Sequence, residues 1–174
     1  MKNVKLIYGT DTGNTEYVID TYILTELTNH NFEYELTEVG DITPSDWESH
    51  NFYILGIPTW YDGELQSDWE NYFEDFKKIN FTGKTVAIFG LGDQVGYDEW
   101  FCDGVGILAE VVLENGGKLI GQWSRDDSYD FNTEPKSLID KNTFFGLTID
   151  QDNQEELTQT RCSKWFEQIL SIIE

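Results

Sequence analysis

Three threonines and a glycine in the stretch GTDTGNTE (residues 9–16) are residue types that can bind a phosphate group. The stretch follows an apolar run and precedes a segment with helical spacing, so it is predicted to join a strand to a helix N-terminus. There the unpaired N–H groups and the helix dipole attract anions, and the hydroxyls of Thr10, Thr12 and Thr15 add donors. Gly13 lets the backbone approach the ligand closely. An ordinary turn with threonine caps is the alternative.

The same stretch contains Asp11 and Glu16 but no Lys or Arg, so it lacks the lysine of the phosphate-binding loop of nucleotide-hydrolysing enzymes. No Lys or Arg occurs anywhere in residues 6–76 or 85–117. An enzyme that transfers phosphoryl groups needs cations or a metal ion against the developing charge, whereas a carrier only has to hold its phosphate. The absence of cations therefore favours a carrier.

The second candidate loop is GIPTWYDGELQSDWE (residues 56–70). Pro58 and Gly63 predict a turn, and Trp60 and Tyr61 stand at its tip. Large aromatic side chains are costly to expose, so we expect them to cover a flat ligand. The alternative is that Trp60 folds back onto the core, where Trp69 is expected as part of a helical apolar stripe.

The third candidate loop is GLGDQVGYDEW (residues 90–100). Its glycines permit a tight backbone path, Tyr97 supplies another aromatic plane, and Asp93 is placed to meet a polar ring edge. A solvated glycine-rich turn is the alternative. Taken together, one loop for a phosphate and two with aromatic residues predict a phosphorylated planar heterocycle held between rings.

These loops need a scaffold, and the chain alternates strand-length apolar runs with helical patterns. The alternation predicts a parallel sheet covered on both faces, in which ligands bind beyond the carboxyl ends of the strands. Residues 124–142 are polar and irregular, and we interpret them as an insertion that splits the last strand in two. The predicted strands are residues 4–8, 33–39 (an edge strand), 52–57, 85–90, and the two halves 118–123 and 144–149; the helical patterns span 18–27, 69–76, 105–113 and 157–173.

Composition limits the possible functions. The 174 residues are predicted to form a single domain (1–174), and the net charge of −22 excludes the basic surface of a nucleic-acid-binding protein. No long apolar segment or cleavage site is present, which predicts no membrane insertion. Cys102 and Cys162 form no disulfide framework, so a reduced, cytoplasmic protein is expected. The acidity favours a basic protein partner, with solubility or a salt-rich habitat as the alternative.

In their order and spacing, the three loops resemble the long-chain flavodoxins, and the resemblance extends to YDFN (residues 129–132) and GLTIDQDNQEELT (residues 146–158). It implies the α/β flavodoxin-like three-layer sandwich, with a five-stranded parallel sheet of order 2-1-3-4-5 and the insertion in its last strand. It also implies non-covalently bound FMN and one-electron transfer at low potential.

The resemblance also implies roles for individual residues. The first loop would hold the phosphate, Trp60 and Tyr97 would stack on opposite faces of the isoalloxazine, and Asp93 would approach its pyrimidine edge. The Tyr61–Asp62 peptide would lie near flavin N5. The full implied set is Thr10, Asp11, Thr12, Gly13, Asn14, Thr15, Pro58, Thr59, Trp60, Tyr61, Asp62, Gly63, Leu91, Gly92, Asp93, Tyr97, Trp100, Phe101 and Cys102.

Four positions depart from the family pattern. An uncharged residue often stands where Asp11 does and Lys where Asn14 does, and Tyr61 and Asp62 replace smaller or uncharged residues found in some members. Asp11 is expected to point to solvent, because a buried carboxylate beside a phosphate is expensive. Cys102 is expected to be a small buried residue at a helix start, and Cys162 to pack on the last helix. No metal site and no nucleophile with a neighbouring base are predicted.

The expected function is a monomeric one-electron carrier that serves basic-surfaced redox proteins, such as a ferredoxin/flavodoxin–NADP reductase or a photosystem I type partner. The acidic loops are predicted to make its reduced flavin a strong reductant. Two alternatives remain open: an FMN-dependent NAD(P)H:quinone reductase-like enzyme, and a non-redox acidic signalling module of the same topology.

Overall fold

The computed structural model describes residues 2–173, and their central sheet has the strand order β10-β5-β3-β1-β2. Neighbouring strands along this path are parallel. The sequence-based order 2-1-3-4-5 is therefore confirmed, with β5 and β10 as its fourth and fifth strands. The strands are β1 (Lys2–Tyr8), β2 (Phe32–Glu38), β3 (Phe52–Trp60), β5 (Thr85–Leu91) and β10 (Leu147–Ile149).

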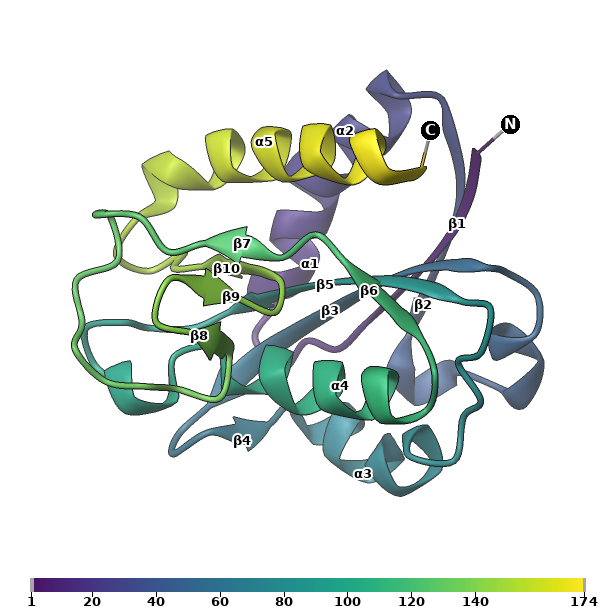
Figure 1. The fold of residues 1–174 in the computed structure, drawn as a ribbon, viewed down its shortest axis with the longest axis horizontal. Coiled ribbons are helices and arrows are strands. Elements are labelled where there is room, and N and C mark those ends of the chain that lie inside the picture. Colours follow the sequence, from purple (N-terminus) through teal and green to yellow (C-terminus); the bar gives the residue numbers. More distant parts are fainter. Residues whose placement is uncertain (1, 174) are drawn as a thin grey trace.

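Helices cover both faces of this sheet (Figure 1). The last helix lies with the first helical stretch over one face, and the two middle helices lie against the other. All four predicted helical patterns are confirmed, although the first contains a π-helical turn, η1. The elements are α1 (Asn14–Val18), η1 (Ile19–Ile23), α2 (Leu24–Asn29), α3 (Ser67–Phe76), α4 (Asp103–Glu114) and α5 (Glu155–Ile173), with 3₁₀ turns η2 (Val39–Asp41), η3 (Pro44–Trp47) and η4 (Asp98–Trp100).

The fifth strand is split, as predicted, because two short strands pair with β5 one after the other. The apolar runs 118–123 and 144–149 do not stay in the main sheet over their whole length, however. Gly121, at φ 77°, turns the chain away, and the outer ends of both runs join a small antiparallel sheet of order β7-β9-β8. The additional strands are β6 (Lys118–Ile120), β7 (Trp123–Ser124), β8 (Leu138–Asp140) and β9 (Thr143–Phe144).

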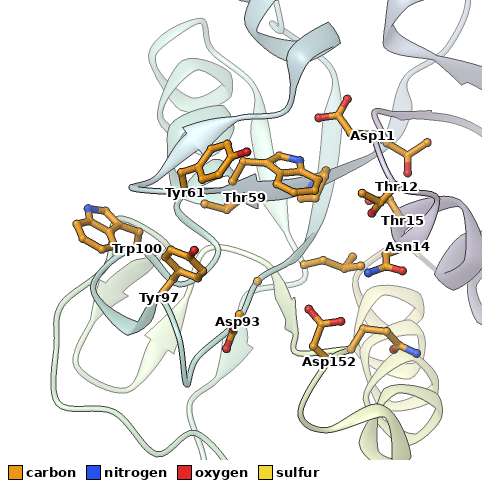
Figure 2. A pocket seen from close by; sticks show the side chains of 16 residues that line it. Asp11, Thr12, Asn14, Thr15, Thr59, Tyr61, Asp93, Tyr97, Trp100 and Asp152 are labelled. Carbon is orange, nitrogen blue, oxygen red and sulfur yellow. The ribbon is translucent and has the colours of Figure 1, made fainter.

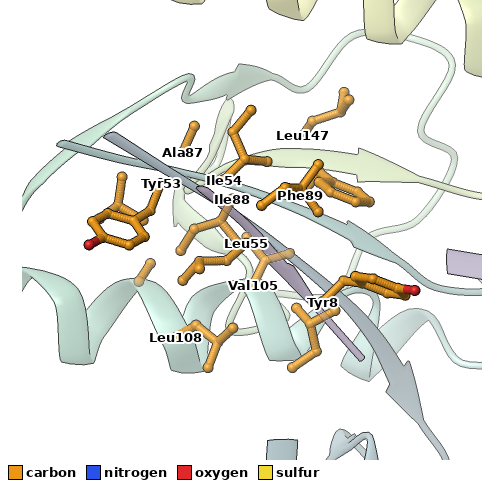
Figure 3. Close-up of a cluster of buried hydrophobic side chains, with 14 of the residues drawn as sticks. Tyr8, Tyr53, Ile54, Leu55, Ala87, Ile88, Phe89, Val105, Leu108 and Leu147 are labelled. Atoms are coloured by element: carbon orange, nitrogen blue, oxygen red, sulfur yellow. The ribbon is translucent and has the colours of Figure 1, made fainter. Parts of the chain in front are cut away.

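The core lies between the central strands and the helices on either side. Ile54 and Leu55 of β3 and Ile88 of β5 are fully buried, as are Val105 and Leu108 on the inner face of α4 (Figure 3). Strands with both faces covered must be almost continuously apolar, which explains their sequence pattern. Each such side chain contributes roughly 1.5–3 kcal/mol by its burial.

Trp69 also lies in the core, as its helical stripe predicted. Its side chain is fully buried, and its Nε1 donates a hydrogen bond to the carbonyl oxygen of Gly56 over 3.0 Å. This contact fixes α3 against the carboxyl-terminal half of β3.

Within residues 2–173, no helix has the length and apolar character that crossing a membrane requires.

A buried lysine, Lys5 of β1, forms ion pairs with the edge strand β2 and with the 3₁₀ turn η3. The ammonium group of Lys5 lies 3.1 Å from Glu35 Oε2 and 2.8 Å from Asp46 Oδ1, and the Lys5 residue is 4% exposed. Hydrogen bonds from Lys5 and Thr43 lower the pKa of Asp46 to about 2. A carboxylate with a lowered pKa stabilises the fold above its ordinary pKa of about 4, and this contribution is lost as the pH falls toward 2.

We therefore predict that Asp46→Asn makes the free energy of unfolding fall less steeply between pH 4 and pH 2 than it does in the wild type. Urea unfolding at a series of pH values measures this. Asp41→Asn, which removes the same charge from an exposed position, is the control. Equal slopes in the Asp46→Asn variant and the wild type would contradict the linkage.

Candidate functional site

The loops that follow β1, β3 and β5 meet at one edge of the sheet and line a cleft of about 190 Å³. Figure 2 shows hydroxyl and amide side chains at one end of the cleft and aromatic rings at the other. The three loops identified from the sequence therefore meet at one cleft. The cleft is lined by Thr10, Asp11, Thr12, Asn14, Thr15, Pro58, Thr59, Trp60, Tyr61, Leu91, Gly92, Asp93, Tyr97, Trp100, Gln151 and Asp152.

The first loop presents unpaired donors to the cleft. Gly13 caps α1 in the left-handed conformation, at φ 89°, and donates its N–H to Thr10 Oγ1 over 3.0 Å. The first backbone hydrogen bond of the helix joins the N–H of Tyr17 to the carbonyl oxygen of Gly13. The N–H groups of the residues just before Tyr17 therefore lie outside the helical hydrogen-bond pattern. The hydroxyl of Thr15 is buried and has no hydrogen-bond partner within the described residues. This end of the cleft can therefore accept an anion.

Asp11 was expected to point to solvent, but its carboxylate also accepts hydrogen bonds from within the protein. The residue is exposed, but its Oδ1 accepts hydrogen bonds from Gln66 Nε2 over 2.8 Å and from Ser67 Oγ over 2.7 Å. Partial burial raises the pKa of Asp11, and these hydrogen bonds more than offset it, so that the pKa lies below its usual value. The carboxylate thus ties the first loop to the start of α3.

The second loop is more ordered than its sequence indicated. β3 continues to Trp60 and pairs with β4 (Glu64–Leu65), so Pro58 lies in a strand and the prediction of a turn there was wrong. Proline is tolerated because β1 no longer pairs with β3 beyond Gly56, so the missing N–H breaks no bond on that side. The turn follows at residues 61–63, where φ is 42° at Tyr61 and 84° at Gly63, so the predicted turn is confirmed at Gly63.

The aromatic residues of this hairpin differ in exposure. Tyr61 is 64% exposed at the tip, whereas Trp60 is half-buried, with its ring centroid 6.1 Å from that of Tyr61. The indole Nε1 of Trp60 is buried without a hydrogen-bond partner in the described part of the chain. Trp60 therefore offers the cleft both a flat apolar surface and a second unpaired donor.

The third loop is closed by its own aspartate. Asp93 Oδ1 accepts hydrogen bonds from the N–H groups of Val95 (2.9 Å) and Gly96 (2.8 Å) and from Asn153 Nδ2 (2.9 Å). Partial burial raises the pKa of Asp93, but these hydrogen bonds together lower it by more, so the pKa of Asp93 lies below its usual value. The carboxylate that lines the cleft is therefore also the cap of the loop that carries Tyr97, which is 43% exposed.

Some residues of the predicted set lie outside the cleft lining. Gly13 contributes the helix cap, and Asp62 and Gly63 lie at the hairpin tip. Phe101 and Cys102 are 1% and 0% exposed, so their side chains face the interior. As expected, Cys102 is a small buried residue at the start of α4, and burial raises the pKa of its thiol well above the usual value, which disfavours a nucleophilic role.

Two lining residues, Gln151 and Asp152, were missed. They lie just beyond β10, separated from it by Asp150, in the turn before α5. The signal was available, because the rule that ligands bind beyond the carboxyl ends of parallel strands applies to the last strand as well. With them, the charged lining residues are Asp11, Asp93 and Asp152, and no Lys or Arg lines the cleft within residues 2–173.

A parallel sheet of this order, with a cleft beyond the carboxyl ends of its central strands, defines the flavodoxin-like class of α/β proteins. Comparison with known proteins agrees, since the model of the flavodoxin family matches residues 6–165. Flavodoxin of Buchnera aphidicola is 39% identical over 173 residues (98% of this chain, 96% of that protein). Flavodoxin of Haemophilus influenzae is 41% identical over 172 residues (97% and 94%).

Among solved structures, Fusobacterium nucleatum flavodoxin bound to flavin mononucleotide superposes with a TM-score of 0.88 at 32% identity, covering 100% of both chains. The chain therefore belongs to the flavodoxin family. Flavodoxins are electron-transfer proteins, so the family and the carrier role expected from the sequence are both confirmed.

The link between the first two loops is testable. We predict that Asp11→Ala lowers the free energy of unfolding by about 1 kcal/mol more than Asp62→Ala does, because only the former removes acceptors from Gln66 and Ser67. Both variants lose one negative charge, so the comparison cancels the relief of charge repulsion. Urea unfolding of the cofactor-free protein measures both, and equal stabilities would contradict the link.

Proposed function

We propose that this protein binds FMN non-covalently in the cleft and carries electrons one at a time between redox proteins. The observation that supports this best is the pair of buried, unpartnered donors, Thr15 Oγ1 and Trp60 Nε1, which both belong to residues lining the same cleft. Buried polar groups are rarely left without a partner, so such donors favour a ligand that has acceptor oxygens. The phosphate and ribityl chain of FMN have them.

The first loop would hold the phosphate. The N–H groups at the start of α1 and the hydroxyls of Thr10, Thr12 and Thr15 are neutral donors, and Asn14 adds an amide. Thr10 already accepts the N–H of Gly13, which leaves its own O–H free to donate. Asp11 does not oppose the phosphate directly, since its carboxylate is turned toward Gln66 and Ser67.

The aromatic end of the cleft would hold the isoalloxazine between Trp60 and Tyr97, with Asp93 near its pyrimidine edge. Tyr61 adopts a left-handed backbone conformation that costs a non-glycine residue roughly 1–2 kcal/mol. The strained residue thus directly precedes the Tyr61–Asp62 peptide, which we propose lies near flavin N5. The backbone of Gly63, Leu91 and Gly92 and the side chains of Pro58, Thr59 and Trp100 complete the proposed site, and Phe101 and Cys102 would act only from behind it.

When bound, FMN supplies the chemistry, because its ring accepts and releases single electrons. The residues around it hold the ring, exclude water and provide no cation. Aromatic cover on both faces would leave no room for a substrate over the ring, which disfavours the quinone reductase alternative. The family membership disfavours the signalling alternative.

The partners we propose are redox proteins with basic surfaces, of the ferredoxin/flavodoxin–NADP reductase or photosystem I type. Asp62, Glu64 and Glu99 are exposed beside the cleft residues Tyr61 and Tyr97, and the charge of −22 favours electrostatic steering to such partners. We further propose that the chain is a monomeric, cytoplasmic, single-domain protein (1–174). Encounters of this type are small and weaken with salt.

Titration of the cofactor-free protein with FMN tests the proposal, with protein fluorescence as the readout. We predict that wild-type protein binds FMN tightly and that Thr15→Val raises the FMN dissociation constant about ten-fold or more, because one hydrogen bond to a charged group is lost. Riboflavin, which has no phosphate, should bind both proteins equally. Failure of the wild type to bind FMN would refute the proposed function.

A second prediction concerns the effect of the acidic loop residues on the reduction potential of the bound flavin. Asp62→Asn, Glu64→Gln and Asp93→Asn combined should raise the potential for adding the second electron by some tens of millivolts, as expected for charges within about 10 Å in a solvent-like dielectric. Spectroelectrochemistry measures this. Glu110→Gln, Glu114→Gln and Glu167→Gln combined remove the same charge from exposed positions away from the cleft lining and serve as the control. Equal shifts in the two triple variants would contradict a local electrostatic effect.

A further inference from the structure

The outer edge of β2 is a surface that the proposed function does not use. Within residues 2–173, β2 (Phe32–Glu38) pairs with β1 only, so one side of its backbone has no neighbouring strand. None of residues 32–38 lines the cleft. A segment bound along this edge would therefore leave the cleft open to its ligand.

This edge has few of the features that normally protect a sheet from a further strand. Proteins keep edge strands short, bulged or interrupted by proline, or place charged residues on them. β2 is seven residues long, contains no proline and pairs with β1 without a register shift. Four consecutive residues, 33–36, are exposed. Of these protective features, β2 has only the charged residues.

On one face of the sheet, the apolar core layer reaches this edge. Tyr34 and Leu36 lie in register beside Val4 and Leu6 of β1, which are fully buried. Residues two apart share a face of a strand, so all four side chains belong to one layer. Tyr34 and Leu36 are nevertheless 41% and 38% exposed, because no described strand lies beyond β2 to cover them. Apolar side chains of a further strand would extend this layer.

The other face of the edge is acidic. Glu33 and Glu35 alternate with the two apolar residues, so both carboxylates lie on the opposite face of β2. Glu33 is exposed, and the side chain of Glu35 is 59% exposed although it pairs with Lys5. No Lys or Arg occurs in residues 6–76 to offset these charges. A strand that extended this face would need basic side chains.

We propose that the outer edge of β2 binds an extended basic segment of a partner protein, which joins the sheet as a further strand. Main-chain hydrogen bonds supply the affinity, and alternate side chains supply the specificity. The segment that fits has apolar residues beside the row of Tyr34 and Leu36 and Lys or Arg beside the row of Glu33 and Glu35. This inference goes beyond the proposed function and does not depend on FMN.

A second copy of this chain fits the edge less well than a basic segment does. Two β2 strands paired edge to edge would bring their acidic rows together, and like charges opposite each other destabilise a strand pair. Each copy also carries a net charge of −22, which opposes self-association. The same charges attract a basic segment, so the charge of the edge selects the partner.

The probe for the test is a blocked, fluorescently labelled peptide of alternating lysine and valine, with the seven-residue length of β2. Fluorescence anisotropy during titration with the whole protein measures the dissociation constant. Two further peptides carry N-methyl groups on all the valines or on all the lysines, which removes the N–H donors from one edge of the peptide at constant charge. Because only one edge of an added strand faces β2, we expect one methylated peptide to bind about ten-fold or more weakly than the other.

A pair of protein variants locates the binding site. Leu36→Lys places a positive charge on the edge and should weaken binding of the unmethylated peptide about ten-fold or more. Leu113→Lys makes the same substitution at a leucine that is 46% exposed on α4, a helix that packs against β5 and β6. It should change the affinity by less than about two-fold, because a distant exposed charge is largely screened. Amide hydrogen exchange in residues 32–38, and not in α4, should slow when the peptide binds.

Equal affinities for the two methylated peptides would indicate binding by charge alone and overturn the proposal, as would equal effects of the two protein variants. A dimer that forms without peptide and is abolished by Leu36→Lys would assign the edge to a second copy instead, and analytical ultracentrifugation detects it. None of these measurements requires bound FMN, so failure of this proposal is distinct from failure of the proposed function.

Discussion

For the proposed function, holding an anion with neutral donors is the constraint on which the rest of this structure depends. No Lys or Arg lines the cleft within the described residues, so backbone N–H groups at the start of α1 and the Thr15 hydroxyl must provide the attraction. Such donors are weak individually and act together only when they converge on one point. The end of β1 and the left-handed Gly13 fix that point, because they aim the helix N-terminus into the cleft.

Neutral donors have to be in place before the ligand arrives, since any ordering at binding would be subtracted from the affinity. The three loops are accordingly fastened to neighbouring elements. Asp11 accepts bonds from the start of α3, Thr59 accepts the N–H of Gly104 over 2.9 Å, and Asp93 accepts a bond from Asn153. Acidic and hydroxyl groups that the sequence suggests as ligand contacts are thus partly used to hold the cleft open in one shape.

Sequence patterns predicted the strands, the helices and the three loops, because apolar periodicity is local and the rule for ligand position follows from topology. The order of the strands in the sheet was implied by the resemblance to the flavodoxins. They did not predict the direction of Asp11 or Phe101. Each side chain is turned by partners far along the chain, Gln66 in one case and Phe131 in the other. Pro58 was misjudged for a similar reason, since only the length of β1 makes a proline acceptable in β3. Long-range packing decided these cases.

The same neutrality that limits phosphate affinity also bears on electron transfer. A cation beside the phosphate would stabilise negative charge on a nearby ring, and its absence leaves the ring reluctant to accept a second electron. In the proposed complex, the acids at the cleft mouth would add to this effect and would also face an approaching partner. Both consequences follow from one charge distribution, so a change that strengthened phosphate binding with a lysine would weaken the protein as a reductant and as a partner for basic proteins.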